Sequence, residues 1–297
     1  MTTDATFQET RRKFIGGSDA PVLWKSGYDG QSLNTIWNEK VLGVKWIPND
    51  DEQRRLDHGA AVEPIIRKWA SREIGEQIIK PDAAIIASGY DCIGAHLDGW
   101  HYDGSALVVD ELKSIGGWQQ RQQWFRDGEE VAPDKHWIQV QHQILCAGAE
   151  YGMLWGMYGT DELLPRKIER DDAFIRDHIK QCLAFWWYVE TKTPPPVDGS
   201  PATSDALFVR HKQHTAGASV ALPEDSDEWG RTLERVDEQI ERLESTRNEL
   251  RNKIKAAIGD AEIGVTPDGE RWSWKTKQVK EYVVAARVQR VLRKIGK

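Results

Sequence analysis

Two acidic residues and a lysine have a spacing that would let them hold a divalent cation against a phosphate group. Asp98 is followed, after a short gap, by Asp110-Glu111-Leu112-Lys113. Alternate side chains of a strand share a face, so Glu111 and Lys113 point the same way. If the run ending at Asp98 is the neighbouring strand, its carboxylate lies beside that of Glu111. Two carboxylates and one ammonium group would form an oxygen-ligand cation site able to activate water for phosphodiester hydrolysis.

A third carboxylate, Glu63, falls on a helix predicted over residues 62–74. The apolar stripe of this helix consists of Val62, Ile65, Ile66 and Trp69. Glu63 stands at the edge of that stripe, from where it could reach the same cation. Several acids in one site also suit two ions about 3.5–4 Å apart. An E-x-K strand by itself is more often a surface ion pair worth under about 1 kcal/mol.

The elements that must position these residues are predicted to be strands and helices of one mixed α/β core. Residues 91–98 and 107–113 are expected to pair as strands, with a turn at Asp103-Gly104. Helices are expected over 137–147 and 171–190. The aromatic residues near the end of the second helix are interpreted as core packing.

The C-terminal third has a different pattern. Four prolines between Thr193 and Ser204 predict a linker. A heptad-like seam follows, which predicts a coiled coil or helical hairpin whose partner the sequence leaves open. The seam consists of Trp229, Leu233, Val236, Ile240, Leu243, Leu250, Ile254 and Ala257, with Arg247 at the one polar position.

Beyond Gly259 the pattern predicts a strand over 263–266, a turn, a strand over 271–277 and a short basic helix over 285–295. Trp272 and Trp274 stand among basic residues. They could stack on single-stranded bases or pack on the coiled coil, and the second interpretation is favoured.

Composition narrows the class of protein. The 297 residues include 29% charged residues and carry a net charge of −7. Residues 271–297 hold nine basic residues and one acid, a net of +8, which leaves −15 for the rest of the chain. No apolar run is long enough to span a bilayer, and the first residues lack a secretory pattern, so no membrane association and a cytoplasmic location are expected.

The three cysteines, Cys92, Cys146 and Cys182, stand far apart. Without a CxxC pair they offer no recognisable zinc or iron–sulfur motif, and they are expected to be small buried residues.

Five separated blocks resemble, in order, the YqaJ-type viral recombinase family. This family includes the phage lambda-type exonucleases within the PD-(D/E)xK nuclease superfamily. The resemblance covers about residues 8–190. The blocks are Ile15-Gly16-Gly17-Ser18-Asp19-Ala20, Gly59–Pro64, Asp98-Gly99, Glu111-Leu112-Lys113 and the Q-x-Q helix Gln139–Leu145.

The resemblance implies a restriction-endonuclease-like PD-(D/E)xK core, with a central mixed β-sheet flanked by helices, over residues 1–200. We then expect a linker over 201–221, the coiled-coil element over 222–258 and a small basic β-containing subdomain over 259–297.

The resemblance also implies roles for individual residues. Glu63, Asp98, Glu111 and the carbonyl of Leu112 correspond to metal ligands, for Mg²⁺ or Mn²⁺, with two ions per site. Lys113 and Gln139 correspond to the catalytic lysine and an active-site glutamine.

Relatives that digest duplex ends hold the terminal 5′-phosphate with residues that correspond to Arg11 and Ser18. Gly16-Gly17 would let the backbone approach such a ligand closely, and Ser18 or Asp19 could cap the helix that follows. His96 departs from the family's Ser or Thr, and with Gln143 it is a candidate for DNA contact.

The function implied is 5′→3′ digestion of linear duplex DNA to give 3′ single strands for phage recombination. The implied partners are DNA ends and a single-strand annealing protein, with a homo-oligomer, a ring of three subunits, as a further expectation. Two alternatives stay open. One is a structure-specific or nonspecific endonuclease with the same metal site, and the other is a non-catalytic DNA-binding assembly protein.

Overall fold

The computed structural model describes residues 9–28, 30–44, 49–213 and 215–278. The chain divides into two compact units, Met1–Lys212 and Gln213–Lys297. Among the described residues, no helix is both long and apolar enough to cross a bilayer.

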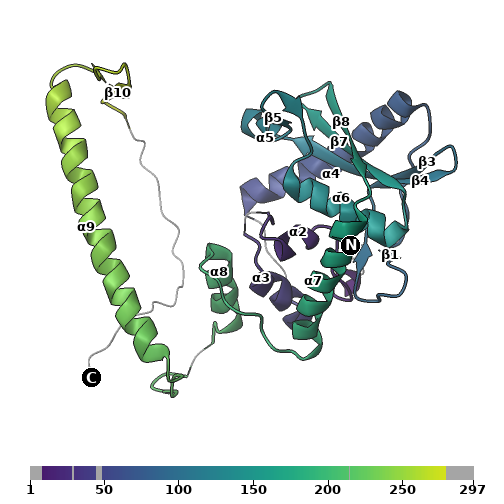
Figure 1. Cartoon of the computed structure of the whole chain (residues 1–297), viewed down its shortest axis with the longest axis horizontal. Coiled ribbons are helices and arrows are strands. Elements are labelled where there is room, and N and C mark those ends of the chain that lie inside the picture. Colours follow the sequence, from purple (N-terminus) through teal and green to yellow (C-terminus); the bar gives the residue numbers. More distant parts are fainter. Residues whose placement is uncertain (1–8, 29, 45–48, 214, 279–297) are drawn as a thin grey trace. The chain divides into compact units, whose positions relative to one another are not determined.

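A mixed four-stranded sheet forms the centre of the first unit (Figure 1). Its strands, in spatial order, are β3 (Gly99–Asp103), β4 (Ala106–Ile115), β7 (Tyr151–Tyr158) and β8 (Glu162–Glu169). β4 and β7 are parallel, whereas β3 and β8 pair antiparallel with their neighbours. Gly104, with φ of 61°, makes the turn between β3 and β4. The predicted mixed sheet is therefore confirmed.

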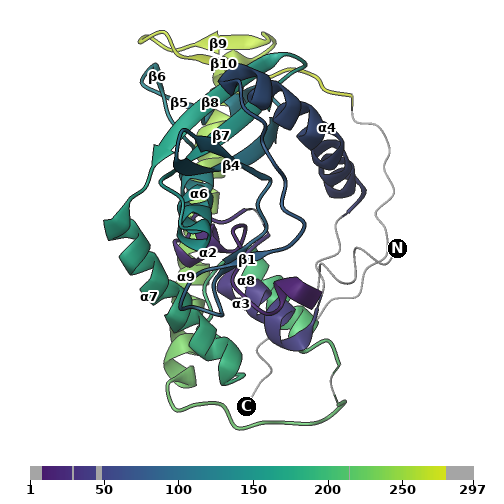
Figure 2. The ribbon, with the colours of Figure 1, turned by 90° about the vertical axis from the view of Figure 1, so that its right-hand side faces the viewer.

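Helices cover both faces of this sheet (Figure 2). On one face, α4 (Asp50–Ile74) packs Ile66 and Ala70 against Leu112 of β4. On the other, α6 (Asp134–Ala147) packs Val140 and Ile144 against Val109, with α7 (Asp172–Glu190) beside it. Because alternate residues of β4 face opposite helices, Glu111 and Lys113 lie on the α6 face.

Shorter elements complete the first unit. They are α2 (Ala20–Leu23), α3 (Leu33–Trp37), the π-helix η1 (Asn38–Leu42), β1 (Ile85–Ile86), β2 (Gly94–Ala95), α5 (Trp118–Gln122), β5 (Phe125–Arg126), β6 (Glu129–Glu130) and α8 (Pro201–Arg210).

The strand predicted over 91–98 is wrong in its extent and its partner. Only β2 is a strand there, and it pairs with β1, whereas the strand beside β4 begins at Gly99. The backbone of this segment instead bonds to the N-terminal region, since the amide of Gly94 donates to the carbonyl of Ile15 at 3.1 Å.

The helix predicted over 62–74 is also longer than expected. It begins at Asp50 because Asn49 and Glu52 form a capping box that satisfies its first amide groups. Ile65, which was assigned to the buried stripe, is 45% exposed, and Ile66 and Ala70 take the core positions.

The linker predicted over 201–221 is wrong for its first ten residues, which form α8. Pro201 stands at the start of this helix, where the lost amide costs nothing, and the Ser200 hydroxyl accepts from the amide of Thr203. Ala202, Thr203 and Ala206 are buried. Asn38 donates to the carbonyl of Ala206 at 2.8 Å, which ties α8 to η1.

In the second unit, α9 (Ser226–Ile258) precedes a hairpin of β9 (Ile263–Val265) and β10 (Arg271–Ser273). The predicted long helix and strand–turn–strand are therefore present. The hairpin meets α9 where Gly264 lies against Ile258, whereas Trp272 and Trp274 are about half exposed. The packing of these tryptophans on the coiled coil therefore stays a prediction. The basic helix predicted over 285–295 lies outside the described residues.

Candidate active site

Glu111 is the centre of the candidate site. Its side chain is 1% exposed, so this carboxylate is almost fully buried in β4. Gln139 donates to its Oε1 at 2.7 Å and Gln143 to its Oε2 at 2.5 Å, both from α6. Lys113, two residues along β4, lies 2.5 Å from Oε1. Burial opposes the charge of Lys113, but Glu111 more than compensates and raises the pKa of this lysine.

Asp98 faces Glu111 from the residue before β3. Its Oδ2 accepts from the amide of Leu112 at 3.0 Å. The pairing of β3 with β4 ends at Gly99 and Asp110, so beyond this point Asp98 replaces a strand neighbour. The amide and carbonyl of one strand residue point to the same edge, so the Leu112 carbonyl faces the same gap.

The charge on Asp98 is disfavoured in the absence of a cation. Burial and the nearby charge of Glu111 raise the pKa of Asp98 to about 7, despite the opposing effect of Lys113. A second buried polar group lacks a hydrogen-bond partner, namely Oε1 of Gln143. Both observations are typical of a site that gains stability from a bound cation.

Glu63 approaches this cluster from α4, on the other face of the sheet. Its charge adds to the rise in the pKa of Asp98. Glu63 is held by Arg67, one turn further along the helix, and by Lys80 at 2.7 Å. Arg67 also donates to the backbone carbonyl of Asp98 at 3.1 Å. The three acids named from the sequence are therefore brought together, with Glu63 engaged by two cationic side chains.

Arg11 and Ser18 are also brought together. Arg11 donates to the Ser18 hydroxyl at 3.2 Å and to Asp19 at 3.3 Å. Asp19 does not cap α2 with its side chain, which corrects that part of the sequence interpretation. It accepts instead from the amide of Gly16 at 2.9 Å and pairs with the buried Lys40 at 2.7 Å.

Charge pairing fixes Arg11 in this corner of the fold. Despite burial, Lys40 and Arg11 lower the pKa of Asp19 to about 2. Burial opposes the charge of Arg11, but Asp19 and Glu39 raise its pKa. His96 lies near the guanidinium group of Arg11. Burial and then the charge of Arg11 lower the pKa of this imidazole.

Gly17 connects the arginine–serine pair to the acidic cluster. A Cβ at Gly17 would lie 3.4 Å from Cγ of Gln139 and 3.7 Å from Cγ of Gln143. The backbone before α2 therefore packs directly on the two glutamines that hold Glu111. Ser18, the next residue, stands beside the same site.

Sequence reasoning missed Tyr28 and His136, which both contact the site. The Tyr28 hydroxyl donates to Oε1 of Gln139 at 3.1 Å and lies 3.2 Å from Nδ1 of His136. Because Oε1 of Gln139 accepts this bond, its amide nitrogen must face Glu111. Neither residue has a spacing in the sequence that points to Glu111, whereas Arg67 could have been found as the i+4 partner of Glu63.

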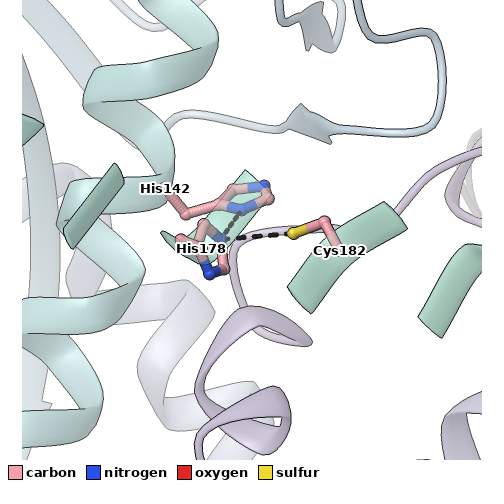
Figure 3. Close-up of side chains that lie close together, drawn as sticks. All are labelled: His142, His178 and Cys182. Atoms are coloured by element: carbon pink, nitrogen blue, oxygen red, sulfur yellow. Dashed lines mark hydrogen bonds between the residues drawn. The ribbon is translucent and has the colours of Figure 1, made fainter. Parts of the chain in front are cut away.

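A separate cluster, His142, His178 and Cys182, also has metal-ligand residue types (Figure 3). Its candidate ligand atoms all lie within 4.8 Å of one another. Trp24 donates from Nε1 to Nδ1 of His178 at 2.9 Å. Because indole is only a donor, His178 carries its hydrogen on Nε2, which lies 2.9 Å from Nδ1 of His142.

The chain of bonds ends at the backbone, where Nε2 of His142 lies 2.9 Å from the carbonyl of Gly94. A metal on Nε2 of His178 would move its hydrogen to Nδ1, where it would face the Trp24 N–H. The geometry therefore favours a neutral hydrogen-bonded chain over a metal centre. Burial and then His142 lower the pKa of His178 to about 3, in agreement with this assignment.

The sheet, its flanking helices and the acid–acid–lysine cluster at a strand end define a PD-(D/E)xK nuclease fold. Residues 6–150 match the YqaJ-like viral recombinase domain. This match spans all five sequence blocks and agrees with the resemblance that they predicted.

Named relatives agree with this assignment. The chain is 28% identical over 262 residues to "Uncharacterized protein YqaJ" of Bacillus subtilis (strain 168), covering 86% of this chain and 78% of that protein. Its fold is similar to that of LHK-Exo, an alkaline exonuclease from Laribacter hongkongensis, with a TM-score of 0.51 and 18% identity over 70% of this chain and 97% of the other. LHK-Exo in complex with dAMP gives a TM-score of 0.50 and 20% identity over 69% and 95% of the two chains.

Proposed function

We propose that this protein is a magnesium-dependent deoxyribonuclease that digests linear duplex DNA from its 5′ ends. One observation carries the proposal. Gly17 packs on Gln139 and Gln143, and these amides hold Glu111, so the Arg11–Ser18 pair stands next to the acidic cluster. A phosphate-binding pair beside a water-activating site is what an end-directed nuclease needs. The complex of LHK-Exo with dAMP, a deoxynucleotide, agrees with this class of substrate.

Asp98, Glu111 and the Leu112 carbonyl would hold the cation, with Glu63 as a further ligand once it is released from Arg67 or Lys80. These are the hard oxygen ligands that Mg²⁺ prefers, and Mn²⁺ would also fit. A bound cation would lower the pKa of a ligated water and screen the phosphate charge.

The protein's own side chains align the reacting groups. Gln139 and Gln143 fix the Glu111 carboxylate, and Tyr28 fixes the orientation of the Gln139 amide. Lys113, whose raised pKa keeps it charged, can donate to the attacking water or to a phosphate oxygen as negative charge develops there. The water oxygen bonds to phosphorus, the bond from phosphorus to the 3′-oxygen breaks, and that oxygen takes a proton.

The polarity follows from the proposed role of Arg11 and Ser18. If they hold the terminal 5′-phosphate, the next phosphodiester lies at the acidic cluster. Each cut then leaves a new 5′-phosphate that can occupy the same place. The annealing protein and the ring of three subunits remain predictions from the family resemblance.

The test compares 5′-phosphorylated linear duplex, 5′-hydroxyl linear duplex and closed circular DNA, each with Mg²⁺ and with EDTA. We expect rapid loss of the phosphorylated duplex, slower loss of the hydroxyl form, an intact circle and no digestion in EDTA. Cleavage of the circle would assign an endonuclease instead. Absence of all digestion by folded protein would favour a non-catalytic DNA-binding role.

Two variants separate the parts of the site. Lys113→Ala should reduce the rate on every linear substrate by at least about a hundredfold, as expected for loss of a charged group in the transition state. Arg11→Ala should remove the preference for a 5′-phosphate while leaving slow digestion. Arg12→Ala is the matched control, because the adjacent arginine bonds the backbone carbonyls of Lys40 and Val41 instead.

A further inference from the structure

The described residues of the second unit leave the seam of α9 largely uncovered. This seam consists of Trp229, Leu233, Val236, Ile240, Leu243, Leu250, Ile254 and Ala257, with Arg247 at its polar position. Six of its apolar side chains, from Trp229 to Leu250, are 42–69% exposed. The hairpin of β9 and β10 reaches Ile258, beyond the end of the seam. An apolar stripe of this length on a 33-residue helix, interrupted only at Arg247, is typical of a surface that pairs with another helix.

The charges of α9 are distributed unevenly between its two halves. Residues 226–242 hold six acids and three basic residues, a net of −3. Residues 243–258 hold two acids and four basic residues, a net of +2. Two copies in parallel would set like halves beside each other, whereas antiparallel copies would set the acidic half of each beside the basic half of the other.

We propose that the seam pairs with the seam of a second copy of this chain as an antiparallel coiled coil centred between Leu243 and Arg247. In heptad terms Leu233, Ile240, Arg247 and Ile254 are the a residues, and Trp229, Val236, Leu243, Leu250 and Ala257 are the d residues. Antiparallel helices pair a with d. The layers are Leu233 with Ala257, Val236 with Ile254, Ile240 with Leu250 and Leu243 with Arg247, each occurring twice.

Flanking charges select this register. It sets Asp237 of one copy beside Arg251 of the other, on both sides of the twofold axis. A shift by one heptad towards the N-terminus would set Asp237 beside Glu244 and create two repulsive pairs. A shift by one heptad towards the C-terminus would set Glu244 beside Arg251 but would lose one kind of layer, leaving three. Charge therefore excludes one shift, and the number of apolar layers disfavours the other.

Arg247 disfavours the parallel arrangement. In a parallel in-register pair the two Arg247 side chains would meet in the core. In the antiparallel pair each lies against Leu243 of the other copy, close to the twofold axis. Arg247 already pairs with Glu244 of its own helix at 3.1 Å, so its charge has a partner when the helices meet. A single polar seam residue is a common determinant of helix orientation.

Cysteine crosslinking of the full chain tests the orientation. Thr246 lies beside its own counterpart only in the antiparallel pair. The two Val236 side chains are adjacent only in the parallel pair and about 27 Å apart in the antiparallel one. Under mild oxidation Thr246→Cys should form a covalent dimer and Val236→Cys should not. The wild-type chain measures the background, since Cys92, Cys146 and Cys182 are buried.

A charge swap tests the register by sedimentation equilibrium. Asp237→Arg should weaken the dimer about tenfold, because two attractive pairs become repulsive. The double variant Asp237→Arg, Arg251→Asp should recover the wild-type dissociation constant. Ser245→Arg, on the outer face of α9, is the matched control and should change little.

Three outcomes would overturn the proposal. One is failure of Thr246→Cys to crosslink, and another is efficient crosslinking through Val236→Cys. The third is a monomeric full chain that dimerises only when residues 279–297 are removed, because those residues would then cover the seam. None of these outcomes depends on nuclease activity.

Discussion

Asp98 lies close to Glu111 and Glu63, and the ammonium group of Lys113 lies beside Glu111. Burial, with the charge of Glu111, raises the pKa of Asp98 from 3.8 to about 7. The folded state therefore binds a proton more tightly than the unfolded state does. The stability that this proton contributes is lost as pH rises through the folded pKa of about 7. At alkaline pH without metal, the ionised Asp98 is a source of instability.

Asp98→Asn should therefore stabilise the metal-free protein at pH 8, by about 1–3 kcal/mol. The asparagine oxygen can still accept from the Leu112 amide, but it adds no charge beside Glu111. Urea unfolding in EDTA at pH 8 measures the gain, and nuclease assays should show loss of activity in the same variant. The exposed Asp82→Asn is the control and should leave the unfolding midpoint unchanged. A destabilised Asp98→Asn protein would refute the electrostatic explanation.

Tyr28 is a positioning residue in the proposed nuclease, because its hydroxyl bonds to Gln139, which holds Glu111, and also to Lys113. Tyr28→Phe keeps the ring but removes the hydroxyl, so the Gln139 amide can rotate away from Glu111. We expect kcat on linear duplex to fall about five- to tenfold, the equivalent of one hydrogen bond, with KM little changed. Tyr102→Phe, an exposed residue of β3, is the matched control. Equal kcat values for wild type and Tyr28→Phe would exclude a positioning role for the Tyr28 hydroxyl.

At the scale of elements, strong local patterns were predicted well. The periodicity of α6, α7 and α9 and the turn at Gly104 are local properties, and the structure agrees with them. The pairing of 91–98 failed because the segment bonds instead to residues distant in sequence. Helix α8 was missed because its stability comes from contacts with α3 and η1 as well as from its caps.

The residues of the candidate site also divide into those that local sequence predicts and those that only tertiary packing places. The acids and Lys113 could be found from strand alternation together with family motifs. Tyr28, Arg67 and Lys80 reach the site through tertiary packing, and of these only Arg67 leaves a signal in sequence spacing.

The histidine chain between α6 and α7 should make the fold sensitive to acid. His178, with a folded pKa of about 3, stays neutral where unfolded histidine, with a pKa near 6.5, takes up a proton. The unfolded state thus binds more protons in this interval, and stability falls as pH decreases from about 6.5 towards 3. We expect a loss of up to about 1.4 kcal/mol per pH unit from this residue.

Urea unfolding between pH 7 and pH 5 measures this slope. His178→Gln can accept from Trp24 and donate to His142 without taking up a proton, so its slope should be shallower. His58→Gln, at an exposed position of α4, should keep the wild-type slope. Identical slopes for wild type and His178→Gln would exclude His178 as the cause.

At the scale of the whole molecule, the chain consists of a nuclease-fold unit that ends at Lys212 and a second unit that carries α9. Helix α8 belongs to the first unit by its contacts. Arg210 donates to Asn38 at 3.1 Å and to Asn34 at 2.9 Å, and its guanidinium lies 4.6 Å from the Trp37 ring centroid. Together with the buried side chains of α8, these contacts hold α3 and η1 in place, and η1 carries Lys40, the partner of Asp19.

A chain ending at residue 212 should therefore fold alone, with a single cooperative unfolding transition, whereas a chain ending at residue 200 should be less stable by about 2–4 kcal/mol. The difference is the burial of a short helix and a few hydrogen bonds. Urea unfolding compares the two chains, and Asp205→Ala in the longer one, on the exposed face of α8, should change little.

The shorter chain should also lose the preference for 5′-phosphorylated ends before it loses Mg²⁺ binding, since α8 supports η1, Lys40 and Asp19 rather than Glu111. Equal stability of the two chains would show that residues 201–210 do not stabilise the first unit and belong to the linker.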